Sequence, residues 1–532
     1  MTRRQKLVVT GVALALLAAV PVGLAASGGD SPRSARPVHH RRVRQPAPLR
    51  PLAPTPLRPL TATVALGATG PPIPRSFLGL SMEYWGIPLF EARPVALARV
   101  LGLLHVPGDG PLMIRIGGDS ADQSLWNPDT RRIPRWVFRL SRGWLEQTDD
   151  LLGRVRLRLI LDLNLVTASP LRAAAWARAA LAGLRPGSIA AFEVGNEPDL
   201  YDRGYWLSTI AHTGAVLPAA ISPRSYLHTF DAYARALRSF APTVPLMGPA
   251  VAKPEHSLGF IRVLALHARS ELGALSAHRY PYSACALPGS AAFATVSRLL
   301  SPAAVTNVTG SVRRAVTVAH AAGLPLRLTE LNSVTCGGRP GVSDTFATAL
   351  WAPDALFALL RTGVDSVAVH VRARTINAAF VPVRTGVAAR PLLYGLIAFV
   401  RTVAAGGHLV ASPVRGAPGA DVTAWAVRAP DGTLRLLLLA KGRRTVRVRL
   451  PAAIGGLAVV TRLWAASPWA RGGMTLGGRW LDTGGRWRGR ASIEHPGPVA
   501  GGSEVTLPGG TAALVTSRLS LPARATGHLR SR

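Results

Sequence analysis

The chain has 532 residues, enough for about two to four domains or for one large barrel with an accessory module. Hydrophobic residues make up 48% of it and charged residues 17%, which excludes a disordered protein. Two cysteines exclude a disulfide-dense scaffold and any cysteine-rich metal module. The formal charge of +35 raises the question of an anionic partner, but all but three of the 62 basic residues are arginines scattered along a chain rich in Ala, Gly and Pro. We therefore expect no nucleic-acid partner.

The N-terminal 26 residues have the layout of a secretory signal. Three basic residues precede an apolar run, Leu7–Val20, and small residues follow at Ala25 and Ala26. The alternative is an uncleaved anchor, since the apolar stretch approaches the ~20 residues that span a bilayer. Both interpretations place the protein outside the cytoplasm, secreted or at the cell surface. Residues 27–60 are rich in Pro and Arg and predict an extended, solvated linker.

Between residues 61 and 402, eight short apolar runs with β-compatible sequence recur at regular spacing, each bounded by Gly, Pro or Asn. Helical stretches lie between them, for example Ser169–Leu184, Ser225–Phe240 and Ser311–Gly323. This alternation predicts an α/β protein, a (β/α)8 barrel. A doubly wound sheet is the alternative, but it usually carries a Gly-rich phosphate loop after its first strand, and none is present. The expected strands lie within Ser76–Tyr84, Pro111–Ser120, Arg156–Val166, Ile189–Asp199, Pro245–Ala252, Leu275–Ser283, Pro325–Ser333 and Val364–Arg372.

After residue 402 the pattern changes to short strands separated by Gly and Pro turns. Asp431–Gly432, between two alternating apolar runs, is a strong hairpin signal. Residues 403–521 therefore predict an antiparallel β-sandwich, and 522–532 a basic tail. The early strand Thr61–Ala68 precedes the barrel and is a candidate to pair with this module.

Two glutamates fall at the ends of predicted strands, where a barrel carries its chemistry. Glu197 ends the fourth run, in GNEPD, and Glu330 ends the seventh, in LTELNS. A pair of carboxyl groups facing each other across a sugar-sized gap is the machinery of glycoside hydrolysis, which needs no metal or cofactor. Glu193 is the rival carboxylate, but it lies deeper in the barrel, and we interpret it as a buried structural partner of Arg115.

A set of ordered motifs resembles glycoside hydrolase family 79, which holds β-glucuronidases and heparanase-like enzymes within a large clan of retaining barrels. FEVGNEPDLY and LTELNSVTCGG carry the resemblance, together with SFLGLSMEYW, RIGGDSADQSLW, HRYPYS and RPLLYGLIAFVR. The resemblance spans roughly residues 74–517, and it implies a secreted enzyme that binds a glucuronide or a uronate-containing glycan.

The resemblance assigns roles to single residues. It implies that Glu197 is the acid/base, that Glu330 is the nucleophile and that Asn196 binds the sugar 2-hydroxyl. It places Tyr280 like the clan's tyrosine that holds the nucleophile. Further candidates for sugar contacts at the strand ends are Glu83 with Tyr84, Asp119, Asn164, His278 and His370.

One stretch departs from the family pattern. Where family glucuronidases often carry a Gly-rich segment with a tyrosine after the eighth strand, this chain reads HVRARTINAAFVPVRTG, with Arg372, Arg374 and Phe380. Two interpretations stay open: an arginine meets the sugar carboxylate, or the sugar is not a uronate. Another sugar specificity within the clan, or a non-catalytic carbohydrate-binding protein, is the alternative function.

The two cysteines follow adjacent strands. Cys285 lies five residues past Tyr280, and Cys336 six past Glu330, so both fall in neighbouring loops. In an exported protein they are candidates for a disulfide beside the site, and two free thiols are the alternative. The oligomeric state has no signal in the sequence.

Overall fold

The protein is described from a computed structural model, which places residues 58–127, 136–201, 221–455 and 457–517. The expected signal segment, nearly all of the linker and the basic tail lie outside these ranges. Among the residues that are placed, no helix has the length and apolar character needed to cross a bilayer.

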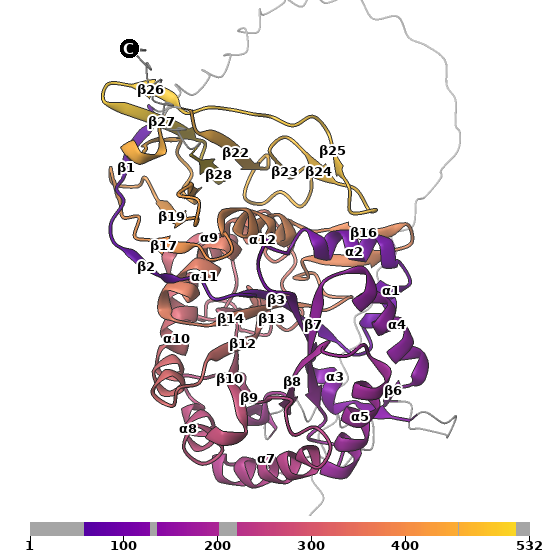
Figure 1. The fold of residues 1–532 in the computed structure, drawn as a ribbon. Helices are drawn as coiled ribbons and strands as arrows, with labels where there is room; N and C mark the ends of the chain where they lie inside the picture. The colour runs from indigo at the N-terminus through magenta and orange to yellow at the C-terminus, as the bar shows by residue number, and fades with distance from the viewer. Residues whose placement is uncertain (1–57, 128–135, 202–220, 456, 518–532) are drawn as a thin grey trace, which may run out of the picture. The chain divides into compact units, whose positions relative to one another are not determined.

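Eight parallel strands close into a barrel, in the spatial order β3-β4-β7-β8-β9-β10-β12-β14 and back to β3 (Figure 1). Each predicted run coincides with one barrel strand, although β10 begins three residues before its run, and this confirms the (β/α)8 barrel. The strands are β3 (Leu78–Glu83), β4 (Leu112–Gly117), β7 (Leu157–Leu163), β8 (Ile189–Val194), β9 (Leu246–Val251), β10 (Leu272–Arg279), β12 (Leu326–Leu331) and β14 (Ser366–Val371).

The barrel strands are buried on both faces, since helices cover the outside and side chains fill the inside. Every residue of β3 and of β4 is buried, which explains why both read as near-continuous apolar runs. Arg115, in the middle of β4, and Glu83, at the end of β3, are charged side chains with almost no exposed surface. A charge is retained at such a position only with partners, so this arginine marks the polar interior of the barrel.

Helices follow the strands, and serine side chains cap the starts of some of them. The hydroxyl of Ser169 accepts from the backbone of Arg172 at the start of α5, and Ser222 and Ser225 form a capping box before α7. The predicted helix Ser311–Gly323 is the second half of a longer one, which begins with a proline after Ser301. The helices are α1 (Ile87–Glu91), α2 (Pro94–Gly102), α3 (Asp119–Asp122), α4 (Arg142–Arg154), α5 (Pro170–Gly183), α7 (Pro223–Arg238), α8 (Leu258–His267), α9 (Val296–Leu300), α10 (Pro302–Ala321), α11 (Ala347–Thr362) and α12 (Pro391–Thr402).

Two further sheets follow the barrel, and their pairings are antiparallel except that of β1 with β21. The seven-stranded sheet has the order β2-β17-β19-β20-β28-β22-β23 and the five-stranded sheet the order β18-β1-β21-β27-β26. Because β1 (Leu60–Val64) pairs with β18 and β21, the strand that precedes the barrel joins the C-terminal sheets. The remaining strands of these sheets are β2 (Thr69–Pro72), β17 (His408–Val410), β18 (Val414–Gly416), β19 (Val422–Arg428), β20 (Leu434–Ala440), β21 (Val446–Arg449), β22 (Val459–Trp464), β23 (Thr475–Leu476), β26 (Gly497–Val499), β27 (Gly502–Leu507) and β28 (Thr511–Thr516).

Alternation along β20 divides its leucines between two cores. Leu437 and Leu439 belong to the cluster that the sheet shares with the barrel, whereas Leu436 and Leu438 belong to a cluster shared with the five-stranded sheet. The hairpin predicted at Asp431–Gly432 joins β19 to β20. Four two-stranded sheets complete the fold: β5 (Ser124–Trp126) with β6 (Phe138–Leu140), β11 (Tyr282–Ser283) with β13 (Val334–Thr335), β15 (Phe380–Val383) with β16 (Gly386–Ala389), and β24 (Trp480–Leu481) with β25 (Trp487–Arg488).

Candidate active site

Two carboxyl groups meet at the C-terminal mouth of the barrel. Glu330 is the last residue but one of β12, and Glu197 lies three residues beyond the end of β8. One carboxylate oxygen of each, and a ring nitrogen of His278, all lie within 4.8 Å of one another. Closure of the barrel thus brings together two glutamates that are 133 positions apart in the sequence.

Glu330 is surrounded by donors. The hydroxyl of Tyr280 donates to its Oε1 at 2.5 Å, Nδ1 of His370 lies 3.2 Å from the same oxygen, and Nη1 of Arg115 donates to Oε2 at 3.3 Å. Burial by itself would raise the pKa of Glu330, but the charges of His370, His278 and Arg115, with the His370 hydrogen bond, hold it well below the usual value. This carboxyl group is therefore ionised at neutral pH.

His370 sits between two carboxylates. Its Nδ1 lies 2.8 Å from the Tyr280 hydroxyl, and its Nε2 lies 3.3 Å from Oε1 of Glu83, a contact whose geometry falls short of a hydrogen bond. Burial disfavours the charged ring, but Glu330 and Glu83 outweigh it and raise the pKa of His370 to about 10. Because Tyr280 gives its proton to Glu330, only the doubly protonated ring can direct an N–H at each of its neighbours.

Arg115 connects the nucleophile candidate to the barrel interior. Its Nε donates to Glu193 at 2.8 Å, and its Nη2 donates to Asp162 at 2.7 Å and to Oδ1 of Asn196 at 3.0 Å. With the Nη1 bonds to Glu330 and to Ser81 Oγ, all five N–H groups are used. The interpretation of Glu193 as a buried partner of Arg115 is confirmed. Asp162, which the sequence analysis did not single out, is pushed toward its neutral form, because burial raises its pKa more than Arg115 lowers it.

Glu197 has the opposite environment to Glu330. Its Oε1 lies 3.0 Å from Nδ1 of His278, and burial raises its pKa to about 7, against the lowering effect of that histidine. Its backbone is left-handed, with φ 50° and ψ 51°, a conformation that costs free energy in a residue other than glycine. The glutamate is held there by its amide, which donates to the carbonyl of Ala250 on β9.

Asn196 precedes Glu197 and is buried beside Arg115. Its Oδ1 accepts from that arginine, and among the described residues no acceptor lies within hydrogen-bond distance of its amide nitrogen. The hydrogen bond from Arg115 thus fixes the orientation of the Asn196 amide. The NH2 group points away from the arginine and is available to donate to a bound hydroxyl group.

Charged groups from β3, β14 and the start of α3 form one wall of the site. Nη1 of Arg372 donates to Asp119 Oδ2 at 3.1 Å, and its Nε lies 3.6 Å from Glu83 Oε1. The guanidinium carbon lies 5.6 Å from the centre of the Trp85 ring. Arg372, an arginine of the HVRAR stretch, reaches this wall, and two carboxylates already match its charge.

Two residues expected to contact the sugar are used elsewhere. Asn164 donates to Asp122 O, Ser124 O and Thr167 Oγ1, and its oxygen accepts from two backbone amides, so its amide has no capacity left. The hydroxyl of Tyr84 donates to the carbonyl of Asp162 inside the barrel. Phe380 is fully buried, with its ring centre 5.4 Å from that of Phe90. We correct Asn164 and Tyr84 to framework residues, and Phe380, in the stretch after the eighth strand, belongs to the apolar core.

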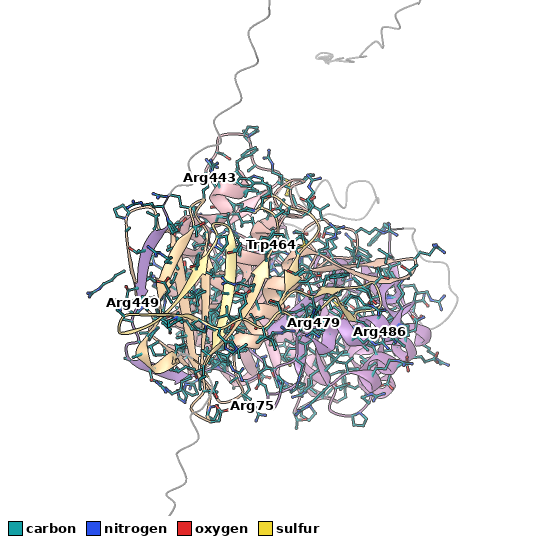
Figure 2. The ribbon with its side chains drawn as sticks, turned by 90° about the horizontal axis from the view of Figure 1, so that it is seen from above. Arg75, Arg443, Arg449, Trp464, Arg479 and Arg486 are labelled. Carbon is teal, nitrogen blue, oxygen red and sulfur yellow. A yellow bond between two sulfur atoms is a disulfide. The ribbon has the colours of Figure 1, made fainter. Side chains whose placement is uncertain are left out.

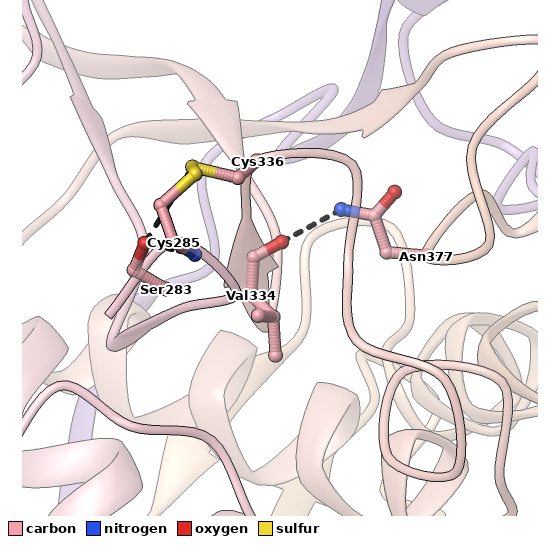
Figure 3. The surroundings of a disulfide bond; sticks show 5 residues. All are labelled: Ser283, Cys285, Val334, Cys336 and Asn377. Atoms are coloured by element: carbon pink, nitrogen blue, oxygen red, sulfur yellow. Dashed lines mark hydrogen bonds between the residues drawn. A yellow bond between two sulfur atoms is a disulfide. The ribbon is translucent and has the colours of Figure 1, made fainter. Parts of the chain in front are cut away.

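The two cysteines form a disulfide between the loops that follow β10 and β12 (Figure 3). Cys285 and Cys336 are flanked by the short parallel pair β11–β13, in which Tyr282 is level with Val334. The carbonyl of Val334 also accepts from Nδ2 of Asn377, which ties the loop after β14 to the same place. The covalent link therefore fixes the loops that follow the strands of Tyr280 and Glu330.

Glu197, His278 and Glu330 also satisfy the spacing of a metal site. The charges disfavour this use. The pKa of Glu197 is raised to about 7, so it is partly protonated at neutral pH, and Glu330 is faced by Arg115 and by a cationic His370. A divalent cation would add charge next to two cations. The same features suit a proton donor next to a fixed carboxylate.

Fold and site together define a (β/α)8 barrel with paired glutamates at its mouth, followed by antiparallel sheets. Solved glycosidase structures share this fold. A 4-O-α-L-rhamnosyl-β-D-glucuronidase from Fusarium oxysporum 12S has a TM-score of 0.65 at 19% identity, over 85% of this chain and 100% of that one. A GH51 arabinofuranosidase from Xanthomonas axonopodis pv. citri has a TM-score of 0.60 at 17% identity, over 86% and 100%. A glucosidase from Croceicoccus marinus has a TM-score of 0.53 at 15% identity, over 87% and 99%.

No protein-family model and no curated protein matches the sequence. At identities below 20%, the structural likeness establishes the fold. The chemistry has to be argued from the site itself.

Proposed function

We propose that the protein is a retaining glycoside hydrolase of the clan that these barrels represent, with β-D-glucuronides as its first substrate class. The observation that carries the proposal is the contrast between two carboxyl groups whose nearest oxygens lie within 4.8 Å. Retaining enzymes place these groups about 5–5.5 Å apart and inverting ones about 6.5–9.5 Å. One group has a pKa raised to about 7 and the other a pKa well below its usual value, as a proton donor and a nucleophile require.

The chemistry follows from these charges. The carboxylate of Glu330 attacks the anomeric carbon and forms a glycosyl ester, while Glu197 gives its proton to the departing oxygen. Glu197, now ionised, takes a proton from water, and the water oxygen attacks the anomeric carbon and releases Glu330. The NH2 group of Asn196 is positioned to donate to the sugar 2-hydroxyl, a contact that strengthens in the transition state.

Export is part of the proposal. A disulfide such as that between Cys285 and Cys336 forms and persists in an oxidising compartment. The N-terminal 26 residues carry the features of a secretory signal or anchor. The proposal also includes the architecture of the C-terminal sheets. Because residues of both sheets share one apolar cluster, we interpret them as a sandwich-type module attached to the barrel.

A second candidate is a glycosidase of the same clan with a neutral sugar, such as an arabinofuranosidase. The observation in its favour is that Arg372 is already neutralised by Asp119 and Glu83, and so is a poor partner for a sugar carboxylate.

The test is hydrolysis of an aryl β-D-glucuronide by the purified chain, beside the matched xyloside, glucoside and α-L-arabinofuranoside. Glu330→Ala should abolish turnover, and azide should restore it as a glycosyl azide of inverted configuration. Glu146→Ala, which removes an exposed glutamate of α4, is the matched control and should leave the rate unchanged. NMR of the first-formed sugar reports the anomer: a product with the substrate's configuration supports the proposal, and an inverted one contradicts it. If no glycoside is turned over, catalysis of this class is excluded for these substrates.

A further inference from the structure

The exposed tryptophans of the described chain lie in one stretch, far in sequence from the barrel mouth. Trp464, Trp469 and Trp480 are 45%, 47% and 48% exposed, whereas Trp425 and the buried barrel tryptophans are covered. Together with Arg443, Arg479 and Arg486 we call them the tryptophan–arginine face. Three half-exposed indoles within 17 residues cost free energy in water, so they indicate a partner.

Paired strands carry Trp464 and Trp480. Trp464 ends β22 and is level with Thr475 of β23, and Leu476 of β23 bridges to Arg479, the residue before Trp480. Trp480 is itself level with Arg488 across the β24–β25 ladder. Neighbouring antiparallel residues lie about 5 Å apart, so Trp464 and Trp480 belong to one small patch of connected strands.

Trp469 lies in the loop between β22 and β23, and that loop is pinned to the barrel. The carbonyls of Pro468 and Ala470 accept from the amides of Ala347 and Phe346 at the start of α11, at 2.9 and 2.8 Å. A platform fixed in this way loses little conformational entropy when it binds.

Three arginines of this region have no matching acid in the part of the chain that the structure describes. Arg443 lies 6.0 Å from the centre of the Trp469 ring, and Arg479 is held 5.6 Å from that of Trp487. The nearby acidic residues are already engaged: Asp482 binds Arg488, and Glu494 binds Arg462. Among the described residues, Arg443, Arg479 and Arg486 form no ion pair. In Figure 2, Trp464 and these three arginines are visible from the same side of the molecule.

We propose that the tryptophan–arginine face is a second, non-catalytic binding surface for an acidic polysaccharide, of the polyuronate type. Flat indoles pack on the C–H faces of sugar rings, and guanidinium forks match carboxylates in planar, two-bond contacts. A neutral glycan would pack on the indoles but would offer no anionic partner to the three arginines. A nucleic acid would demand neutralisation of many phosphates, for which three arginines are few.

The experiment is calorimetric titration of polygalacturonate into the full chain carrying Glu330→Ala, which prevents turnover, at 50 and 300 mM NaCl. The double variant Trp464→Ala/Trp480→Ala should weaken binding at least tenfold at both salt concentrations. Arg479→Gln/Arg486→Gln should weaken binding mainly at 50 mM NaCl, and so flatten its salt dependence. In the chain with Glu330 intact, the tryptophan pair should not change hydrolysis of a small aryl glycoside, which also reports correct folding.

The matched control is Arg313→Gln/Arg314→Gln, which removes the same charge from exposed positions of α10. Retained binding in this control supports the proposal. An equal loss in both arginine pairs would mean non-specific attraction to a chain of charge +35 and would overturn it. Unchanged binding in the tryptophan pair, or equal binding of duplex DNA, would overturn it too. Because binding is measured without turnover, its failure is distinct from failure of the proposed hydrolysis.

Discussion

The hydroxyl of Tyr280, the residue that follows β10, donates a 2.5 Å hydrogen bond to Oε1 of Glu330 on β12, 50 positions further along the chain. The same hydroxyl lies 2.8 Å from Nδ1 of His370. Tyr280 therefore joins the carboxylate to a buried cation, and the three side chains act as one unit. Its removal should cost the nucleophile both its orientation and part of its charge stabilisation.

Tyr280→Phe removes this donor and keeps the ring. A hydrogen bond to a charged group contributes about 1.5–3 kcal/mol, so we expect kcat/KM to fall about 10- to 100-fold. Steady-state kinetics with an aryl glycoside measure it. Tyr282→Phe, which loses a bond to the Arg298 carbonyl outside the site, is the control. A variant as active as the wild type would contradict the assigned role.

His370→Gln replaces the cation with a neutral group of similar size. The charge of His370 lowers the pKa of Glu330, so its loss should raise that pKa. Because the nucleophile must be ionised, the acidic limb of the kcat/KM profile should move to higher pH. A change in rate with no movement of this limb would indicate a merely structural role.

His278→Asn should shift the basic limb. Glu197 must be protonated to act as an acid, and burial sets its pKa at about 7, so activity of the wild type should fall as the pH rises through about 7. His278 lowers this pKa, and its removal should move the basic limb upward. It also lowers the pKa of Glu330, so the acidic limb should move in the same direction. A basic limb unchanged in the variant would sink the assignment of Glu197.

Glu91→Gln should stabilise the protein at high pH. Burial raises the pKa of Glu91 to about 8, whereas the unfolded chain releases this proton near 4.5. The unfolding free energy of the wild type should therefore fall as the pH rises between these values, by roughly 5 kcal/mol in total. Denaturant unfolding at pH 5 and pH 8.5 tests this: the variant should gain stability only at pH 8.5. An equal effect at both values would point to packing instead.

Cys285→Ser/Cys336→Ser should destabilise the mouth of the barrel. Closing a loop of 51 residues stabilises the folded state by about 4 kcal/mol in the chain-entropy model. We expect a lower melting temperature and a reduced kcat, because Tyr280 and Glu330 precede the linked loops. A variant with unchanged melting temperature would show that the parallel pair β11–β13 alone holds the loops.

The sequence alone was sufficient for the eight barrel strands, the hairpin at Asp431–Gly432 and the position of two glutamates at strand ends. These features depend on local periodicity, turn chemistry and strand order, which are written along the chain. Only the tertiary structure decided that Asn164 and Tyr84 are framework residues and that the two cysteines form a disulfide. It alone showed that all five N–H groups of Arg115 donate hydrogen bonds inside the barrel. It also supplied the burial and the charges that separate the pKa values of the two carboxyl groups. Burial and charge at Glu197 and Glu330 come from residues up to 215 positions away, and a pKa depends on distances that no local pattern contains.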